Sequence, residues 1–596
     1  MQARRRRLLP VLAMAVAALA LGVGAAADVG SGSGPPTSIG HGGAAASVER
    51  IATQAAIDTL KKGGNAIDAA VAAAGVLGVT EPFSCGVGGG GFMVIRTAEG
   101  KVTTIDGRET APAAMTPTSF WENGTPLPFN DARFSGKSVG VPGTVATWVD
   151  ALDEYGTMRL ADVLQPGIHV ASHGYLIDQT WFDQANAVRD WFDDVPATAA
   201  LFLDPDGTPH DVGTVFTNPG LAATYERIAH LGLKGFYRGA IADALVNTVD
   251  YPTVSPTANH VFRPGVIKMR DLHTYAAPER AATHVNYRGL DVYSMGPPSS
   301  GGSTVGEALN ILEGYPLSSM TPDEAFHYYL EASRYSFADR NAYLADPAYF
   351  DVPLSGLLSK DYAKARRDLI LPTAANPPVV QPGNPYPYVT GEAAATVMQS
   401  ETTTHVVTSD TLGNVVSYTF TIESTGGSAL VVPGFGFLLN NELTDFNFDS
   451  LTHPNRVEGG KRPRSSMSPT IVLDHGKPFL ALGSPGGSTI ITTVLQILFD
   501  RLDEHMSLPD AIADPRASQR NTTRTSAEPA FILSPRATLL LARGQQFVNG
   551  GEIGAATGIE FLADGRVLAA AEPVRRGGGS AMVEFPGQPA GAARMP

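Results

Sequence analysis

The chain has 596 residues, of which 43% are hydrophobic and 17% are charged, so it can bury a large core and is not a disordered polymer. Its 64 glycines and 44 prolines make it rich in loops, but below the level of low-complexity or collagen-like chains. The net charge of −15 disfavours binding along a phosphate backbone, so we expect no nucleic-acid partner.

The first 27 residues have the layout of a secretory signal peptide. A basic run, Arg4 to Arg7, precedes the apolar stretch Leu8 to Gly24 and the small residues Ala25 to Ala27. This pattern predicts that residues 1–27 are removed before Asp28 and that the protein is secreted or periplasmic. An uncleaved membrane anchor is the alternative, because the apolar run approaches the length of a spanning helix. No later stretch is as long and apolar, so no stable membrane span is expected after signal removal.

The next segment is predicted to be a flexible leader followed by two helices. Residues 28–43 are rich in Gly, Ser and Pro and lack apolar periodicity, which indicates flexibility. A first helix is predicted from the N-cap Ser47 to Gly63. A second helix, capped by Asn65 and ending near Val79, is rich in alanine and has no polar face, so it is predicted to be buried.

Two strands are predicted after a glycine-rich loop. The loop spans residues 86–91, and the runs 92–96 and 102–106 have the composition of strands joined by a turn. The single Cys85 cannot form an intramolecular disulfide, so we expect a packed, redox-silent side chain. Residues from about 145 to 341 are predicted to be mostly helical. No zinc-type or EF-hand spacing occurs, so no metal or cofactor is expected.

A proline-rich linker, residues 374–391, precedes a change to β-rich sequence at Thr403. The runs 405–408 and 415–420, joined by a turn at Gly413-Asn414, predict a β-hairpin. Further elements are expected downstream: strands at 470–473 and 479–482, and a helix at 488–503.

The start of this hairpin, Thr402-Thr403-Thr404-His405, has a chemical implication. If the chain is cut before Thr403, the new α-amine is a general base for the adjacent hydroxyl, and one residue carries both nucleophile and base. Taken alone, however, a threonine run in a strand is explained by β-propensity.

A series of motifs extends along the chain in a fixed order. They are Gly63 to Ala70, Gly88 to Met93, Asp106 to Pro112, Pro297 to Gly302, Thr403 to His405, Asn440 to Phe446, Arg464 to Thr470 and Gly483 to Ser488. Together they resemble the motifs of the γ-glutamyltranspeptidase family, and the match runs from about residue 44 to the C-terminus. An ordered set is much more specific than any single motif.

The resemblance implies an α+β fold of the N-terminal nucleophile hydrolase type. This fold is a four-layer αββα sandwich, formed by the large and small chains of one precursor that cuts itself before Thr403. The implied division is a signal peptide at 1–27, a large subunit at 28–402 and a small subunit at 403–596 that begins with the nucleophile.

The resemblance also implies the catalytic residues. Thr403 would take the γ-glutamyl group as an ester, and Thr421 on the second hairpin strand would hydrogen-bond and orient it. Gly486 and Gly487 would offer backbone N–H groups to the oxyanion, because glycine permits close approach of the main chain.

Five further residues are implied to bind the donor. Arg108 would hold the donor's α-carboxylate, since a planar guanidinium fork suits two oxygens, and Ser465 and Ser466 would add hydrogen-bond donors. Glu442 and Asp445 would hold the α-ammonium group.

The sequence departs from the family's pattern in two places. Glu423 stands where many members have Asn, and an extra carboxylate in the substrate-binding set favours an ammonium and repels a carboxylate. The connection 446–461 is short and has no Tyr, whereas many members have a longer lid with an aromatic gate. We therefore expect a more open site that accepts bulky γ-glutamyl donors.

The function implied is a secreted, autoprocessed γ-glutamyltransferase and glutathione hydrolase. It would transfer the γ-glutamyl group of glutathione or related donors to water, amino acids or peptides through an acyl-enzyme on Thr403, without a cofactor. One alternative is a β-lactam side-chain acylase (cephalosporin or glutaryl acylase) of the same fold. The acidic pair Glu442 and Asp445 disfavours it, because a glutaryl group has no ammonium. The other alternative is an uncleaved, inactive binding protein.

Overall fold

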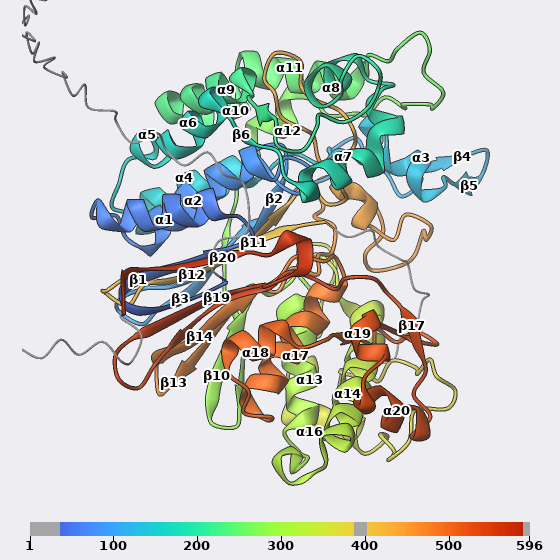
Figure 1. The fold of residues 1–596 in the computed structure, drawn as a ribbon. Coiled ribbons are helices and arrows are strands. Elements are labelled where there is room, and N and C mark those ends of the chain that lie inside the picture. Colours follow the sequence, from blue (N-terminus) through green and yellow to red (C-terminus); the bar gives the residue numbers. More distant parts are fainter. Residues whose placement is uncertain (1–35, 387–401, 588–596) are drawn as a thin grey trace, which may run out of the picture.

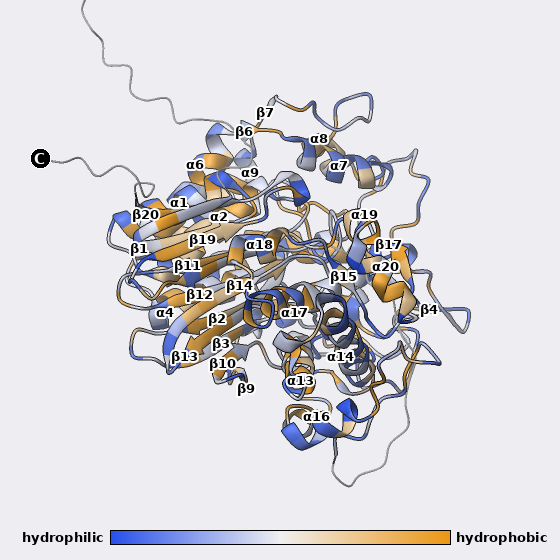
Figure 2. Ribbon diagram, turned by 60° about the horizontal axis from the view of Figure 1, so that its bottom comes forward, coloured by the Kyte–Doolittle hydropathy of each residue, from blue (hydrophilic) through white to orange (hydrophobic). Residues whose placement is uncertain are grey.

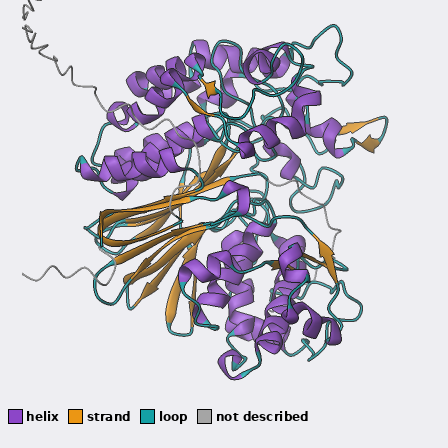
Figure 3. Cartoon of the chain, viewed as in Figure 1, coloured by secondary structure: helices purple, strands orange, loops and turns teal. Residues whose placement is uncertain are grey.

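The computed structural model describes residues 36–386 and 402–587, and the predicted signal peptide at 1–27 lies outside the described residues. Two layers of strands lie between two layers of helices (Figures 1 and 3). Within these residues, no helix combines the length and apolar character that crossing a bilayer requires.

The strands of both layers form one continuous hydrogen-bonded path. In sheet order they are β8 (Glu279–Arg280), β3 (Val102–Gly107), β2 (Gly90–Arg96), β12 (Val415–Thr421), β11 (Thr404–Ser409), β1 (Thr37–Ser47), β19 (Val567–Ala571), β18 (Thr557–Phe561), β14 (Lys477–Gly483), β13 (Thr470–Asp474), β10 (Leu290–Ser294) and β9 (Thr283–Tyr287), with β20 (Ser580–Pro586) paired to β1. The predicted strands at 92–96, 102–106, 470–473 and 479–482 are all present.

Strand β1 connects the two layers. Residues 44–47 pair with β11, whereas residues 37–40 pair with β19, and the register with β20 shifts between His41 and Ala44. The prediction of a flexible leader is therefore wrong for residues 37–43. Their pairing partners come from the C-terminal third of the chain, and the local Gly-rich composition does not reveal them.

One helical layer covers the β2, β11 and β12 side. It includes α1 (Arg50–Lys61), α2 (Ala66–Thr80), α4 (Thr144–Tyr155), α6 (Gln165–His173) and α9 (Pro219–Leu231). Asn65 caps α2 as predicted, since its side chain accepts from the backbone N–H groups of Ile67 and Asp68. The predicted cap Ser47 is wrong: it ends β1, and the carboxylate of Glu49 caps α1.

The second helical layer includes α13 (Gly301–Leu312), α14 (Pro322–Tyr343), α16 (Lys360–Arg367), α17 (Thr489–Leu502), α18 (Leu508–Ala513) and α20 (Pro535–Ala542). The alternation of β2 divides the core: Met93 and Ile95 pack in the cluster that contains α1 and α2, whereas Phe92 and Val94 pack in the cluster that contains α13, α14 and α17. Apolar residues accordingly line the strands in both layers (Figure 2).

The hairpin β11–β12 positions the predicted nucleophile. Its ladder begins with Thr404 opposite Phe420. Thr403 therefore lies at the end of β11, close to Thr421 at the end of β12, and Thr421 is itself paired with Gly90 of β2. Both threonine side chains are buried at this end of the sheet.

Candidate active site

The hydroxyl of Thr403 lies beside the peptide bond that precedes it. Its Oγ1 donates to the carbonyl oxygen of Thr402 at 2.6 Å and lies 3.3 Å from Oγ1 of Thr421. Oγ1 of Thr421 lies 3.0 Å from the same Thr402 carbonyl and accepts from the backbone N–H of Glu423 at 2.8 Å. The two hydroxyl groups therefore converge on one carbonyl group.

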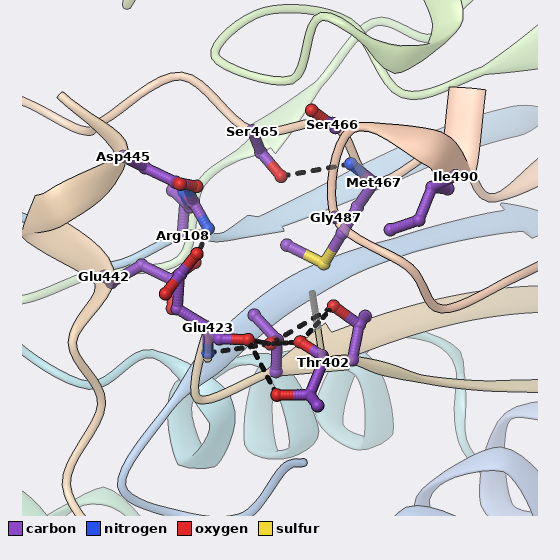
Figure 4. A pocket seen from close by; sticks show the side chains of 12 residues that line it. Arg108, Thr402, Glu423, Glu442, Asp445, Ser465, Ser466, Met467, Gly487 and Ile490 are labelled. Atoms are coloured by element: carbon purple, nitrogen blue, oxygen red, sulfur yellow. Dashed lines mark hydrogen bonds and ion pairs between the residues drawn. The ribbon is translucent and has the colours of Figure 1, made fainter. Parts of the chain in front are cut away.

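These hydroxyl groups lie in a pocket (Figure 4), lined by Arg108, Thr402, Thr403, Thr421, Glu423, Glu442, Asp445, Ser465, Ser466, Met467, Gly487 and Ile490. The structure thus brings together nine of the ten residues that the sequence suggested. Gly486 is the exception and is absent from the lining.

Arg108 is the centre of a buried charge network. It follows β3, is 1% exposed, and forms ion pairs with Glu442 and Asp445. Its Nε and Nη2 also donate to the carbonyl oxygens of Pro463 and Arg464, each at 3.1 Å. Glu442 and Asp445 form the two ends of the 3₁₀ helix η3 (Glu442–Asp445), so one short turn supplies both anions. The pocket lining therefore contains one buried cation, Arg108, paired with two carboxylates, Glu442 and Asp445.

Glu423 is held in an unusual conformation. Its φ is 79°, in the left-handed region that non-glycine residues rarely adopt, and its carboxyl group bonds to Ser424 and Asn441. Burial, with the neighbouring Asp445, raises the pKa of Glu423 to about 8. Most of this carboxyl group is therefore protonated at neutral pH, and the expected extra negative charge develops only under alkaline conditions.

Ser465 and Ser466 are fixed by hydrogen bonds to neighbouring groups. Oγ of Ser465 accepts from the backbone N–H of Met467 at 3.1 Å, and Oγ of Ser466 accepts from Arg340 at 2.6 Å. Arg340, on α14, also donates to Ser300 at 2.9 Å, and the hydroxyl of Ser300 donates to the carbonyl of Ser465 at 2.6 Å. Arg340 of helix α14 and Ser300 at the start of α13 therefore hold the serine pair in place by hydrogen bonds.

Gly486 and Gly487 have backbone conformations that other residues rarely adopt. Their φ values are 128° and 51°, and helix α17 begins two residues later at Thr489. The backbone N–H groups at a helix start carry partial positive charge, which favours an anion nearby. Gly487 lines the same pocket as Thr403 and Thr421.

The family model for gamma-glutamyltranspeptidase matches residues 52–582. The chain belongs to this family. It is 39% identical over 492 residues to the glutathione hydrolase proenzyme of Bacillus subtilis (strain 168), which covers 80% of this chain and 81% of that relative. It is 37% identical over 546 residues to the glutathione hydrolase proenzyme of Escherichia coli (strain K12), covering 89% of this chain and 90% of that one.

Solved structures agree with this assignment. The crystal structure of a cephalosporin acylase from Bacillus halodurans superposes with a TM-score of 0.81 and 28% identity, covering 92% of this chain and 96% of that chain. The predicted fold, an αββα sandwich of the N-terminal nucleophile hydrolase type, is therefore confirmed for this gamma-glutamyltranspeptidase family member.

Sequence reasoning missed several residues of this gamma-glutamyltranspeptidase site. Met467 and Ile490 line the pocket, and Arg340 and Asn441 hold its polar side chains. Glu109 follows Arg108 in a quoted motif; its carboxylate oxygens have no hydrogen-bond partner among the described residues, and burial raises its pKa to about 8. Glu109, Asn441 and Met467 had a signal, because all three lie inside motifs of the family. Within the described ranges, no group of three or more His, Cys, Asp or Glu is arranged to hold a metal.

Proposed function

We propose that this chain is an autoprocessed γ-glutamyltransferase and glutathione hydrolase whose nucleophile is Thr403. One observation carries the proposal: Oγ1 of Thr403 lies 2.6 Å from the Thr402 carbonyl oxygen, in a pocket that also contains the buried ion pairs of Arg108 with Glu442 and Asp445. A hydroxyl so close to its own preceding carbonyl is arranged for attack on that peptide bond.

Maturation begins when Oγ1 of Thr403 attacks the carbonyl carbon of Thr402. The C–N bond breaks, the acyl group moves to Oγ1 as an ester, and the nitrogen takes up the hydroxyl proton and becomes the free α-amine of Thr403. Water then hydrolyses the ester, which leaves a large chain ending at residue 402 and a small chain beginning at Thr403. Thr421, 3.0 Å from the Thr402 carbonyl oxygen, stabilises the developing negative charge there by hydrogen bonding.

Turnover uses the same oxygen. The α-amine of Thr403 accepts the hydroxyl proton while Oγ1 attacks the γ-carbonyl of the donor, and the leaving amine departs with a proton. The backbone N–H of Gly487, supported by Gly486 and the start of α17, stabilises the oxyanion. Water releases glutamate from the ester, whereas an amino acid or dipeptide receives the γ-glutamyl group.

Donor recognition follows from the charge network. In the free pocket, the cation of Arg108 is paired with Glu442 and Asp445. A γ-glutamyl donor carries one carboxylate and one ammonium on its α-carbon, so it can insert with the carboxylate on Arg108 and the ammonium on the two carboxylates. Each charge of the pocket then keeps an opposite partner, which limits the cost of desolvation. Ser465 and Ser466 add hydrogen bonds to the donor carboxylate.

Intact mass and N-terminal sequencing of the purified protein test the proposal. We expect two chains, one beginning at Thr403, and hydrolysis of a γ-glutamyl anilide. Thr403→Ala is expected to remain one chain without activity, whereas Thr403→Ser keeps a hydroxyl and is expected to mature, though more slowly. A normally cut Thr403→Ala protein would contradict the nucleophile assignment. A stable single wild-type chain would favour the uncleaved binding protein.

A β-lactam side-chain acylase is the second candidate, favoured by the superposition on the cephalosporin acylase. Glutaryl and γ-glutamyl anilides form a matched pair of substrates, because they differ only in the α-amino group. Glu442 and Asp445 would lose their ammonium partner with a glutaryl donor, so we expect a preference for the γ-glutamyl anilide. A preference for the glutaryl substrate would assign the chain to the acylases.

Export belongs to the same proposal. Cleavage of residues 1–27 and release to the periplasm or medium predict a large chain that begins at Asp28. N-terminal sequencing of the large chain from the exported fraction tests this division. A large chain that still carries the apolar stretch would indicate a membrane anchor.

A further inference from the structure

An arginine outside the pocket lining contacts the main chain of the nucleophile. Nη1 of Arg576 donates to the carbonyl oxygen of Thr403 at 2.7 Å. Because the ladder between β11 and β12 begins with Thr404, this carbonyl lies one residue before the ladder. Arg576 lies in η4 (Arg575–Gly577), in the connection between β19 and β20, 173 residues further along the chain (Figure 1).

The backbone around Arg576 is fixed on both sides. Its φ is 55°, in the left-handed region that is unusual for a residue with a side chain. Its backbone N–H donates to Glu552 at 3.0 Å, and its carbonyl accepts from the hydroxyl of Thr180 at 3.0 Å. The preceding Arg575 is buried and pairs with Glu528 through two nitrogens, at 2.6 and 2.5 Å. These contacts hold an unfavourable backbone conformation that directs the side chain toward Thr403.

The guanidinium group also lies near the partly buried carboxyl group of Glu81. Burial raises the pKa of Glu81, at the C-terminal end of α2, to about 7, and the positive charge of Arg576 opposes this effect. A hydrogen bond from a charged donor to a carbonyl oxygen is stronger than one from a neutral donor. The contact is therefore suited to fixing the backbone of Thr403.

We propose that Arg576 is a positioning residue for the nucleophile. By holding the carbonyl of Thr403, it keeps Oγ1 aligned with the Thr402 carbonyl during maturation and with the donor carbonyl during turnover. The inference rests on the proposed function of Thr403. Alignment matters because a displacement of about 1 Å can cost roughly 100-fold in rate.

Arg576→Gly is the principal test variant, because glycine accepts the φ of 55° and the substitution removes only the side chain. Arg576→Lys keeps a cationic donor. Arg566→Ala, which removes an exposed arginine paired with Asp564 in the same C-terminal region, is the matched control. The measurements are the rate at which the small chain appears, kcat and KM for a γ-glutamyl anilide, and the melting temperature.

We expect Arg576→Gly to slow maturation and to lower kcat by about 10- to 100-fold, with KM within about two-fold of wild type. Arg576→Lys is expected to be intermediate and Arg566→Ala to match wild type. Millimolar guanidinium ion is expected to restore part of the kcat of Arg576→Gly. Removal of the Arg576 side chain leaves space for the ion beside the Thr403 carbonyl, and the following residue, Gly577, lines a cavity of about 220 Å³ with Glu49 and Asp178.

Two results would overturn the inference. One is wild-type maturation and kcat in Arg576→Gly. The other is a loss that follows a lower melting temperature and that guanidinium does not restore, which would indicate a structural role only. Failure of the proposed function is distinguishable, because the wild-type protein itself would then neither mature nor hydrolyse the donor.

Discussion

Glu423→Gln replaces a buried carboxyl group with an amide and keeps the shape of the side chain. Glu423 is 6% exposed, and burial together with Asp445 raises its pKa to about 8. A glutamine resembles the protonated acid and still accepts a hydrogen bond from Asn441 through its amide oxygen. The substitution therefore tests whether the wild-type group is neutral in the folded protein.

The magnitude follows from linkage between protonation and folding. The pKa is raised from 4.5 to about 8, so the unfolded chain loses this proton at a lower pH than the folded chain does. The contribution of Glu423 to the free energy of unfolding is therefore fully present below the lower pKa, and it is lost as the pH rises towards the higher pKa. Between pH 5 and pH 8 the loss amounts to about 3–4 kcal/mol, since one full pH unit corresponds to about 1.36 kcal/mol and the slope falls as the pH approaches the higher pKa. A glutamine side chain does not titrate, so it adds no such pH dependence to the free energy of unfolding.

The comparison is best made in a Thr403→Ala background, where the protein is expected to stay one chain. Melting temperature and urea unfolding are measured at pH 5 and pH 8 for this parent protein and for the same protein with the added substitution Glu423→Gln. We expect Glu423→Gln to gain stability relative to its parent as the pH rises, by about 3–4 kcal/mol over this range. A difference between the two proteins that is independent of pH would refute the reasoning, because it would mean that Glu423 is ionised in the folded state throughout.

Three further substitutions test the pocket. Arg108→Ala leaves Glu442 and Asp445 without their counter-charge, so we expect at least a ten-fold higher donor KM and about 3–5 kcal/mol lower stability; an unchanged KM would show that Arg108 does not hold the donor. Gly487→Ala places a side chain at a φ of 51°, and we expect kcat to fall at least ten-fold with KM nearly constant; a wild-type kcat would exclude the oxyanion role. Thr421→Val removes a hydroxyl that lies 3.0 Å from the Thr402 carbonyl oxygen, and we expect slower self-cleavage in a time course by gel; wild-type kinetics would contradict its role.

The sequence determined the elements whose signals are local. The hairpin after Thr403 was predictable because two runs rich in β-branched residues flank a Gly-Asn turn. The strand 479–482 was predictable from its short apolar run, and helix α17 from the apolar segment that opens just after Gly486-Gly487. The ordered motifs gave the family, now confirmed, and the set of residues that meet in the pocket. The roles of these residues, the division into two subunits and the signal peptide stay predictions.

Tertiary structure decided what depends on distant parts of the chain. Residues 37–43 of strand β1 were predicted to be a leader because their partners, β19 and β20, lie more than half the chain away. Arg108 meets Asp445 across 337 residues, and Arg576 meets Thr403 across 173. The pKa of Glu423 likewise depends on burial, which only the packed structure creates. Local composition specifies which elements form, whereas long-range packing sets which charges are buried together and therefore what the site can bind.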